Sequence, residues 1–175
     1  MTRRPTLSLN EWAVLGLLVE RPRHGYDIAA ELGPDAPVGQ VWRVARRFVY
    51  RALERLDGLG LAAPERDEPG DSGPPRTVYA ATGPGAEAVA EWLAAPVDHL
   101  RDVRSGLLLK LVLATRLDVP AAPLVEAQRA RFATPLAALA DRPPAGDPVA
   151  LWRHHSAAAV AAFLDDLGAE VAARP

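Results

Sequence analysis

The chain contains no cysteine among its 175 residues. Disulfide scaffolds, thiol nucleophiles and thiolate-ligated zinc sites are therefore excluded. Long apolar runs are also missing, since the longest, from Leu107 to Ala114, is interrupted by Lys110 and is far shorter than the ~20 residues of a membrane-spanning helix. The opening residues, MTRRPTLSLNEW, lack the apolar core of a secretory signal. These absences predict a soluble, cytoplasmic protein.

Motifs of catalytic chemistry are absent as well. The sequence has no GxSxG, P-loop or HExxH pattern, and its glycines cluster in turns. Its one pair of adjacent histidines, His154 and His155, would diverge by ~100° on a helix, and no further metal ligand stands three or four residues away. We therefore expect no enzymatic activity, no cofactor and no metal site.

Positive charge is local in this sequence. The formal net charge of −2 argues against a chain that coats nucleic acid over its whole surface. Between Val38 and Leu56, however, five arginines stand against a single acid, Glu54. Any nucleic-acid contact must therefore be concentrated in a patch of the first half.

The stretch from Arg43 to Leu61 is predicted to be an amphipathic helix. One arc of its helical wheel is apolar and carries Ala45, Val49, Ala52, Leu53, Leu56 and Leu59. The opposite arc carries Arg43, Arg47, Tyr50, Arg51 and Glu54. Such a helix suits a DNA major groove, because phosphates attract positive charge and guanine edges accept paired hydrogen bonds from Arg. An ordinary solvated helix face would give the same pattern, and it stays open as the alternative.

The elements around this helix follow in the order of a winged helix-turn-helix. A capping box of Ser8 and Glu11 starts a first helix, which ends by about Glu20 because Pro22 cannot continue it. The other expected elements are a helix at 25–32, a Pro/Gly-rich link, the basic helix, a hairpin with strands at 61–66 and 76–82 around a polar tip, and a helix from 82 to about 93.

The second half is predicted to be helical throughout. A buried helix is expected around residues 107–113, a second helix after Pro120 or Pro123, and a third after Asp147. The last carries a heptad-like seam of Val149, Trp152, Ser156, Val160, Phe163 and Leu167. The fold class is therefore mainly α, with a DNA-binding domain at residues 1–96 and a helical dimerisation and possible effector domain at residues 97–175.

An ordered set of motifs resembles the PadR family of transcriptional regulators, in its longer, helical-tailed form. The set consists of His24-Gly25-Tyr26-Asp27-Ile28, Trp42, Tyr50-Arg51-Ala52-Leu53, Arg76-Thr77-Val78-Tyr79, Leu107–Leu111 and Leu151-Trp152-Arg153. The resemblance implies a homodimer whose basic helices enter successive major grooves, ~34 Å apart, on a palindromic double-stranded operator. It also implies repression that a small hydrophobic or aromatic effector relieves.

The residues expected to contact DNA are Arg43, Arg46, Arg47, Tyr50, Arg51, Arg66 and Arg76. Arg66 and Arg76, at the base of the hairpin, are expected to contact phosphates, whereas Tyr26 and Tyr79 are expected to pack. The candidates for an effector pocket are Trp12, Trp92 and Trp152, although packing in a helical core is the more common role of such tryptophans.

Three departures from the family pattern keep a second function open. Ala45 stands where a Ser cap is common, Phe48 stands where a small or polar residue is common, and the hairpin tip is acidic. They favour a dimeric ligand- or protein-binding module on the same fold that has lost sequence-specific DNA reading.

Overall fold

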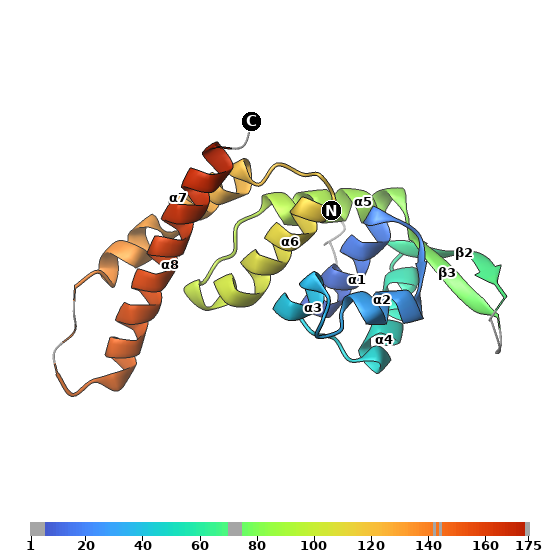
Figure 1. The fold of residues 1–175 in the computed structure, drawn as a ribbon, viewed down its shortest axis with the longest axis horizontal. Coiled ribbons are helices and arrows are strands. Elements are labelled where there is room, and N and C mark those ends of the chain that lie inside the picture. The colour runs from blue at the N-terminus through green and yellow to red at the C-terminus, as the bar shows by residue number, and fades with distance from the viewer. Residues whose placement is uncertain (1–5, 70–74, 142, 144, 174–175) are drawn as a thin grey trace. The chain divides into compact units, whose positions relative to one another are not determined.

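Helices make up most of the chain and accompany one small sheet, so the predicted mainly α fold class is confirmed (Figure 1). The computed structural model describes residues 6–69, 75–141, 143 and 145–173. The chain divides into two compact units. The first unit contains the residues up to Leu93 together with 108–119, and the second contains 94–107 and the residues from Pro120 onward. Residues 108–119, which the sequence analysis assigned to the C-terminal domain, therefore belong to the first unit.

Helix α1 (Leu9–Glu20) is the central helix of the first unit. It begins at the expected capping box: the Ser8 amide donates to the Glu11 carboxylate at 2.6 Å, and the Glu11 amide donates to the Ser8 hydroxyl at 3.4 Å. The helix is buried on almost every side. The two-residue strand β1 (Arg23–His24) and helix α2 (Gly25–Glu31) follow it, and the His24 ring accepts the Asp27 amide at 3.2 Å as the cap of α2.

The basic helix α4 (Arg46–Gly58) is shorter than the sequence analysis predicted. The supposed link before it contains a short helix, α3 (Pro37–Val41), with proline at a favoured first-turn position. Arg43 lies between α3 and α4, so its predicted place on the helix is wrong. The helix starts later because Ala45 is extended, with φ −66° and ψ 142°. Its end is a Schellman motif in which Gly60 has φ 69°, a conformation that glycine adopts without steric cost.

The predicted hairpin consists of β2 (Ala62–Glu68) and β3 (Arg76–Ala81), which pair antiparallel. Strand β1 adds a third, unpredicted strand on the other side of β3. The tip residues 70–74 lie outside the described residues. Thr82 then caps α5 (Gly83–Ala94): its hydroxyl accepts the Gly85 amide at 3.1 Å and donates to the Gly60 carbonyl at 2.7 Å.

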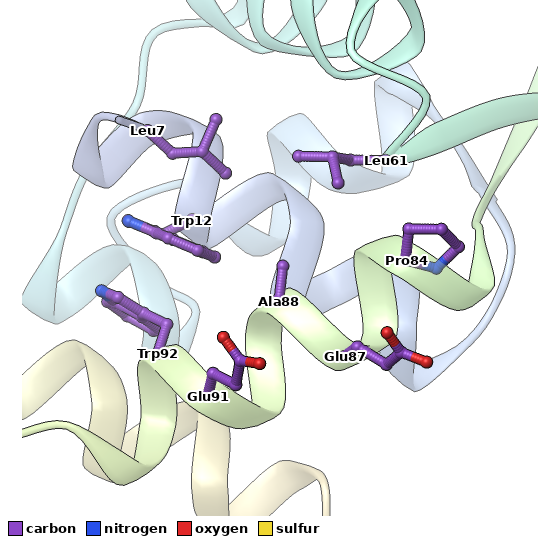
Figure 2. A pocket seen from close by; sticks show the side chains of 8 residues that line it. All are labelled: Leu7, Trp12, Leu61, Pro84, Glu87, Ala88, Glu91 and Trp92. Atoms are coloured by element: carbon purple, nitrogen blue, oxygen red, sulfur yellow. The ribbon is translucent and has the colours of Figure 1, made fainter. Parts of the chain in front are cut away.

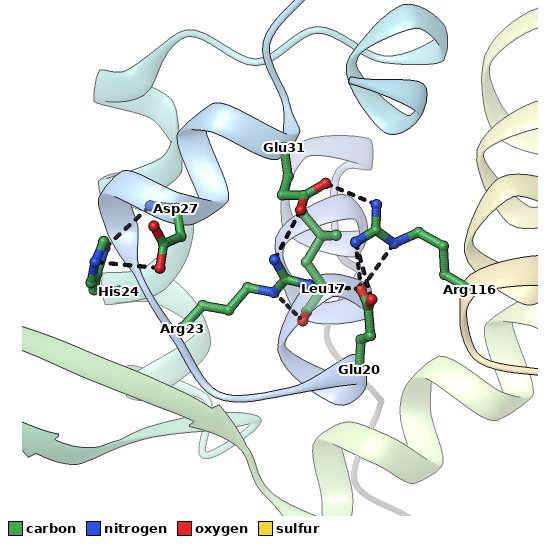
Figure 3. A network of polar contacts seen from close by, with 7 residues as sticks. All are labelled: Leu17, Glu20, Arg23, His24, Asp27, Glu31 and Arg116. Atoms are coloured by element: carbon green, nitrogen blue, oxygen red, sulfur yellow. Dashed lines mark hydrogen bonds and ion pairs between the residues drawn. The ribbon is translucent and has the colours of Figure 1, made fainter. Parts of the chain in front are cut away.

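Helix α6 (Leu108–Arg116) completes the first unit by packing on α1 and carries an arginine into a polar network (Figure 3). Arg116 forms ion pairs of 2.8 Å with Glu20 of α1 and Glu31 of α2. Arg23, only 2% exposed, pairs with the same two carboxylates and donates to the Leu17 carbonyl. The hydrogen bond from Arg116 lowers the pKa of Glu31, against the opposing effect of burial. These side chains hold α1, α2 and α6 together.

The second unit is built on α7 (Ala122–Ala138) and α8 (Pro148–Ala172), which lie side by side (Figure 1). The Asp147 carboxylate caps α8 by accepting two backbone amides at 2.9 and 3.0 Å. A 3-10 turn (Leu100–Asp102) and a π-helical turn (Val103–Leu107) belong to this unit. The side chains that α8 buries are Ala157 and Leu164. Of the predicted seam of α8, Val149 and Trp152 are 59% and 73% exposed, whereas Ser156, Val160, Phe163 and Leu167 are half-buried.

Candidate nucleic-acid interface

The exposed face of α4 carries the predicted arginines. Val49, Ala52, Leu53 and Leu56 are buried, which fixes the helix on α1 and α2 by its apolar arc. The residues that remain exposed on this segment include Arg43, Arg46, Arg47, Tyr50 and Arg51. The structure therefore brings the predicted residues of α4 to one surface, with Arg43 at the entry to the helix.

Most of the other arginines of the first unit are paired, whereas those of this surface are not. Arg23, Arg55 and Arg116 all form ion pairs with carboxylates of α1 or α2. Over the part of the chain that the structure describes, no ion pair is formed by Arg43, Arg46, Arg47, Arg51 or Arg76. Their charge is therefore not neutralised within the fold, and such a surface attracts phosphate.

Tyr26 organises part of this surface, which the sequence analysis did not foresee. The Arg46 guanidinium lies 5.2 Å from the centroid of its ring and the Arg76 guanidinium 5.6 Å from it. Arg46 also lies 5.8 Å from the ring of Tyr50. Tyr26 is 51% exposed, so its ring packs against these arginines at the surface and not in the core. We call Tyr26, Arg46, Tyr50 and Arg76 the Tyr26 cluster; it joins α2, α4 and β3.

The Gly25 position explains how the cluster forms. A Cβ built there would lie 2.7 Å from the Tyr50 ring, so only glycine leaves room for Tyr50 against the start of α2. The sequence places Gly25 next to Tyr26, but it gives no sign that Gly25 lies against Tyr50, because that contact is formed only in the folded chain.

The two hairpin arginines differ in their surroundings. Arg66 donates to Glu68 at 2.8 Å and also pairs with Glu65, next to a bulge in β2. Arg76 lies beside the ring of Tyr26 and forms no ion pair with a carboxylate of the described residues. The wing's own carboxylates thus neutralise Arg66, while the charge of Arg76 stays available.

The first turn of α4 has no side-chain cap. Ala45 occupies the cap position, and its side chain cannot accept a hydrogen bond from the Arg46 or Arg47 amide; the Phe48 amide donates to the Ala45 carbonyl at 2.8 Å. Phe48 is half-buried and packs against the core, with the Arg47 guanidinium 4.7 Å from its ring centroid. Phe48 therefore packs against the core of the first unit.

Two of the three predicted pocket tryptophans lie together. Trp12 of α1 and Trp92 of α5 stack with ring centroids 4.9 Å apart and planes at 11°. They line a cavity of about 430 Å³ in the first unit (Figure 2). Lys110 lies behind Trp92, 4.2 Å from its ring centroid, and burial lowers the pKa of this lysine to about 8. Trp152 belongs to the second unit and does not line this cavity.

In the part of the chain that the structure describes, no group of three His, Asp or Glu side chains is arranged to hold a metal ion. None of the described helices combines the length and apolar character that crossing a bilayer requires. His154 contacts the Leu139 carbonyl at 2.9 Å, a local contact within the second unit.

The first unit is thus a winged helix-turn-helix domain with an exposed basic helix. Residues 14–91 match the model of the transcriptional regulator PadR-like family. This region of the chain is a PadR-like domain, and the resemblance predicted from the motifs is confirmed there.

Comparisons with other proteins gave similar solved structures but no match among curated proteins. A PadR-like transcription factor from Bacteroides fragilis is 28% identical, over 46% of this chain and 73% of that one, with a TM-score of 0.39. Bacillus subtilis PadR in complex with operator DNA is 20% identical, over 90% and 97% of the two chains, with a TM-score of 0.48. The same protein in complex with p-coumaric acid is 19% identical, over 97% and 98%, with a TM-score of 0.43.

Proposed function

We propose that the protein is a homodimeric, DNA-binding transcriptional regulator that inserts α4 into the major groove. The observation that carries the proposal is the set of exposed arginines on and beside α4 that form no ion pair with any carboxylate the structure describes. Arg47 and Arg51 are assigned to base edges and adjacent phosphates. Arg46 and Arg76, held by Tyr26, are assigned to the DNA backbone, because they come from the helix and the wing that flank a groove.

The uncapped start of α4 supports a phosphate contact at the same place. Its first turn contains Arg46 and Arg47, whose charge opposes the helix dipole. Unpaired amides and positive charge at a helix N-terminus together favour a bound phosphate oxygen. In this proposal the absence of a Ser cap at Ala45 is compatible with DNA binding.

The homodimer is proposed from the exposed apolar residues of α8. Val149, Leu151 and Trp152 are exposed at the start of this helix, where a partner copy would cover them. Two-fold symmetry would present two α4 helices to a palindromic operator, with half-sites one helical turn of DNA apart.

We further propose that the protein acts as a repressor and that a small hydrophobic or aromatic molecule releases it. The cavity beside Trp12 and Trp92 is also lined by Leu61 and Pro84. Leu61 joins α4 to β2, and Pro84 lies just after β3, so a ligand there touches both ends of the hairpin. Release would need several kcal/mol of differential affinity for the state that does not bind DNA.

A module that no longer reads DNA remains the second candidate function. The neutralised Arg66 and the inward-packed Phe48 favour it, because each removes a contact that the wing or the groove-facing helix would otherwise make.

The experiment titrates the purified protein onto labelled DNA from upstream of its own gene and onto a scrambled duplex, at two salt concentrations. We expect preference for the upstream fragment, a steep salt dependence, and loss of binding in Arg47→Ala/Arg51→Ala. The matched control is Arg129→Ala/Arg131→Ala, which removes the same charge from α7 and should leave binding intact. Equal, weak and salt-insensitive binding to every duplex would support the second candidate.

A further inference from the structure

We infer that α4 reads guanine bases through Arg47 and Arg51, and that Phe48 positions Arg47 for this contact. The inference rests on the proposed function, because it names the bases that the proposed DNA-binding helix would recognise. It also gives Phe48 a part in DNA reading, although its own side chain is turned toward the core.

The two arginines share one exposed face of α4. Arg47 and Arg51 are one helical turn apart, so their side chains leave the helix in nearly the same direction. Four residues of α-helix rise by about 6 Å, which is close to two base-pair steps of ~3.4 Å. Neither guanidinium forms an ion pair or a hydrogen bond with any group that the structure describes. Both therefore offer all their N–H donors, at a spacing that fits two nearby base pairs.

The side chains of α4 favour guanine over the other bases. Guanine presents two acceptors in the major groove, O6 and N7, which a planar guanidinium contacts with two N–H groups at once. Adenine is read by an amide side chain that donates and accepts together, and α4, with the sequence RRFVYRALERLDG, contains no Asn or Gln. The helix contains no Ser or Thr either. We therefore expect each half-site to contain guanines two or three base pairs apart.

Phe48 provides a fixed support for Arg47. The Arg47 guanidinium lies 4.7 Å from the centroid of the Phe48 ring. The ring is half-buried and packs against the core, so it is held in place by the fold. A guanidinium that already rests on an aromatic ring loses less conformational freedom when it binds a base. Phe48 is thus a positioning residue, and Arg47 makes the contact.

The neighbouring Arg46 has a different place and serves as the matched control. Its guanidinium lies 5.2 Å from the ring centroid of Tyr26 and 5.8 Å from that of Tyr50. It belongs to the cluster assigned to the DNA backbone, so its removal should weaken binding to every duplex by the same factor. Removal of Arg47 should instead weaken only the recognition of one guanine.

The test begins with selection of tightly bound duplexes from a random library by the full chain. Each enriched guanine is then replaced, in both half-sites together, by 7-deazaguanine, which lacks N7 but still pairs with cytosine. Fluorescence anisotropy compares the two duplexes. We expect the unaltered protein to lose at least about threefold in affinity at each guanine that an arginine reads, because one hydrogen bond to a charged donor is removed.

Variants assign each guanine to its arginine. Arg47→Ala should bind the guanine and 7-deazaguanine duplexes equally at one position, and Arg51→Ala at another, whereas Arg46→Ala should keep the full difference at both. Arg47→Lys keeps the charge but loses the planar fork, so it should lose the difference while its salt dependence stays near that of the unaltered protein.

The role of Phe48 is tested with Phe48→Leu, which keeps an apolar side chain but removes the ring. We expect a smaller difference between the two duplexes at the guanine of Arg47 and an unchanged difference at that of Arg51. Phe48→Met removes the ring while filling similar space, and it provides a second such variant. An unchanged difference at both positions, in a variant with an unaltered urea midpoint, would overturn the role of Phe48.

Failure of guanine reading is distinguishable from failure of the proposed function. Enriched duplexes without paired guanines, equal binding of the guanine and 7-deazaguanine duplexes, or the same result for Arg46→Ala and Arg47→Ala would overturn guanine reading and leave sequence-specific DNA binding in place. Selection that enriches no duplex would overturn the proposed function, and the inference with it.

Discussion

Tyr26→Ala provides the sharpest test of the proposed DNA-binding surface. The ring of Tyr26 lies 5.2 and 5.6 Å from the guanidinium groups of Arg46 and Arg76, and it is half exposed. Each such contact contributes about 0.5–1 kcal/mol at an exposed site. Without the ring the two arginines would have to be ordered when DNA binds, so we expect a loss of about 1–2 kcal/mol, or roughly 5- to 30-fold in affinity.

The assay is fluorescence anisotropy of a labelled duplex, titrated at several salt concentrations. Tyr26→Ala keeps both charges, so the slope of log affinity against log salt should stay near that of the unaltered protein. Arg46→Ala removes a charge and should lower the magnitude of that slope by about 0.9. Tyr26→Phe keeps the ring and should bind almost normally. Equal affinities for Tyr26→Ala and the unaltered protein would refute the reasoning, and a Tyr26→Phe loss as large as that of Tyr26→Ala would assign the effect to the hydroxyl.

Two further predictions concern stability. Ala45→Ser supplies the missing cap of α4 and should raise the free energy of unfolding by about 0.5–2 kcal/mol; an unchanged urea midpoint would contradict this. Because burial lowers the pKa of Lys110 from 10.5 to about 8, the folded state binds fewer protons than the unfolded state between those values. Stability should therefore rise by up to about 3 kcal/mol as the pH increases through that window, and Lys110→Met should abolish the rise. An equal rise in the variant, measured by denaturant unfolding at matched pH, would show that another group causes it.

Elements with local signals were predicted well from the sequence. The capping box at Ser8 and Glu11 and the cap at Asp147 carry their own hydrogen-bond partners within three residues, so the starts of α1 and α8 could be read directly. Strand β1 could not be predicted from the sequence, because two residues are too few to show an alternation of polar and apolar side chains. The strand is defined by its pairing with β3. The start of α4 was also misplaced, since the helical wheel continues through Arg43 without a break. The indole N–H of Trp42 donates a hydrogen bond to the side-chain oxygen of Asn10, 32 residues away, and a local sequence pattern cannot predict such a contact.

The same reasoning explains why the candidate site was only partly predictable. In the sequence, nothing shows that Arg23, Arg66 and Arg116 form ion pairs with carboxylates while Arg46 does not. The fold separates them by the acids that it brings near: Arg116 meets Glu20 across 96 positions of sequence, and Arg66 meets acids of its own strand. Arginines that find carboxylates hold the domain together. Those left on α4 beside Tyr26 form no ion pair with any carboxylate that the structure describes. A polyanion can therefore bind them without first breaking an ion pair, and this makes that surface the part of the molecule best suited to DNA.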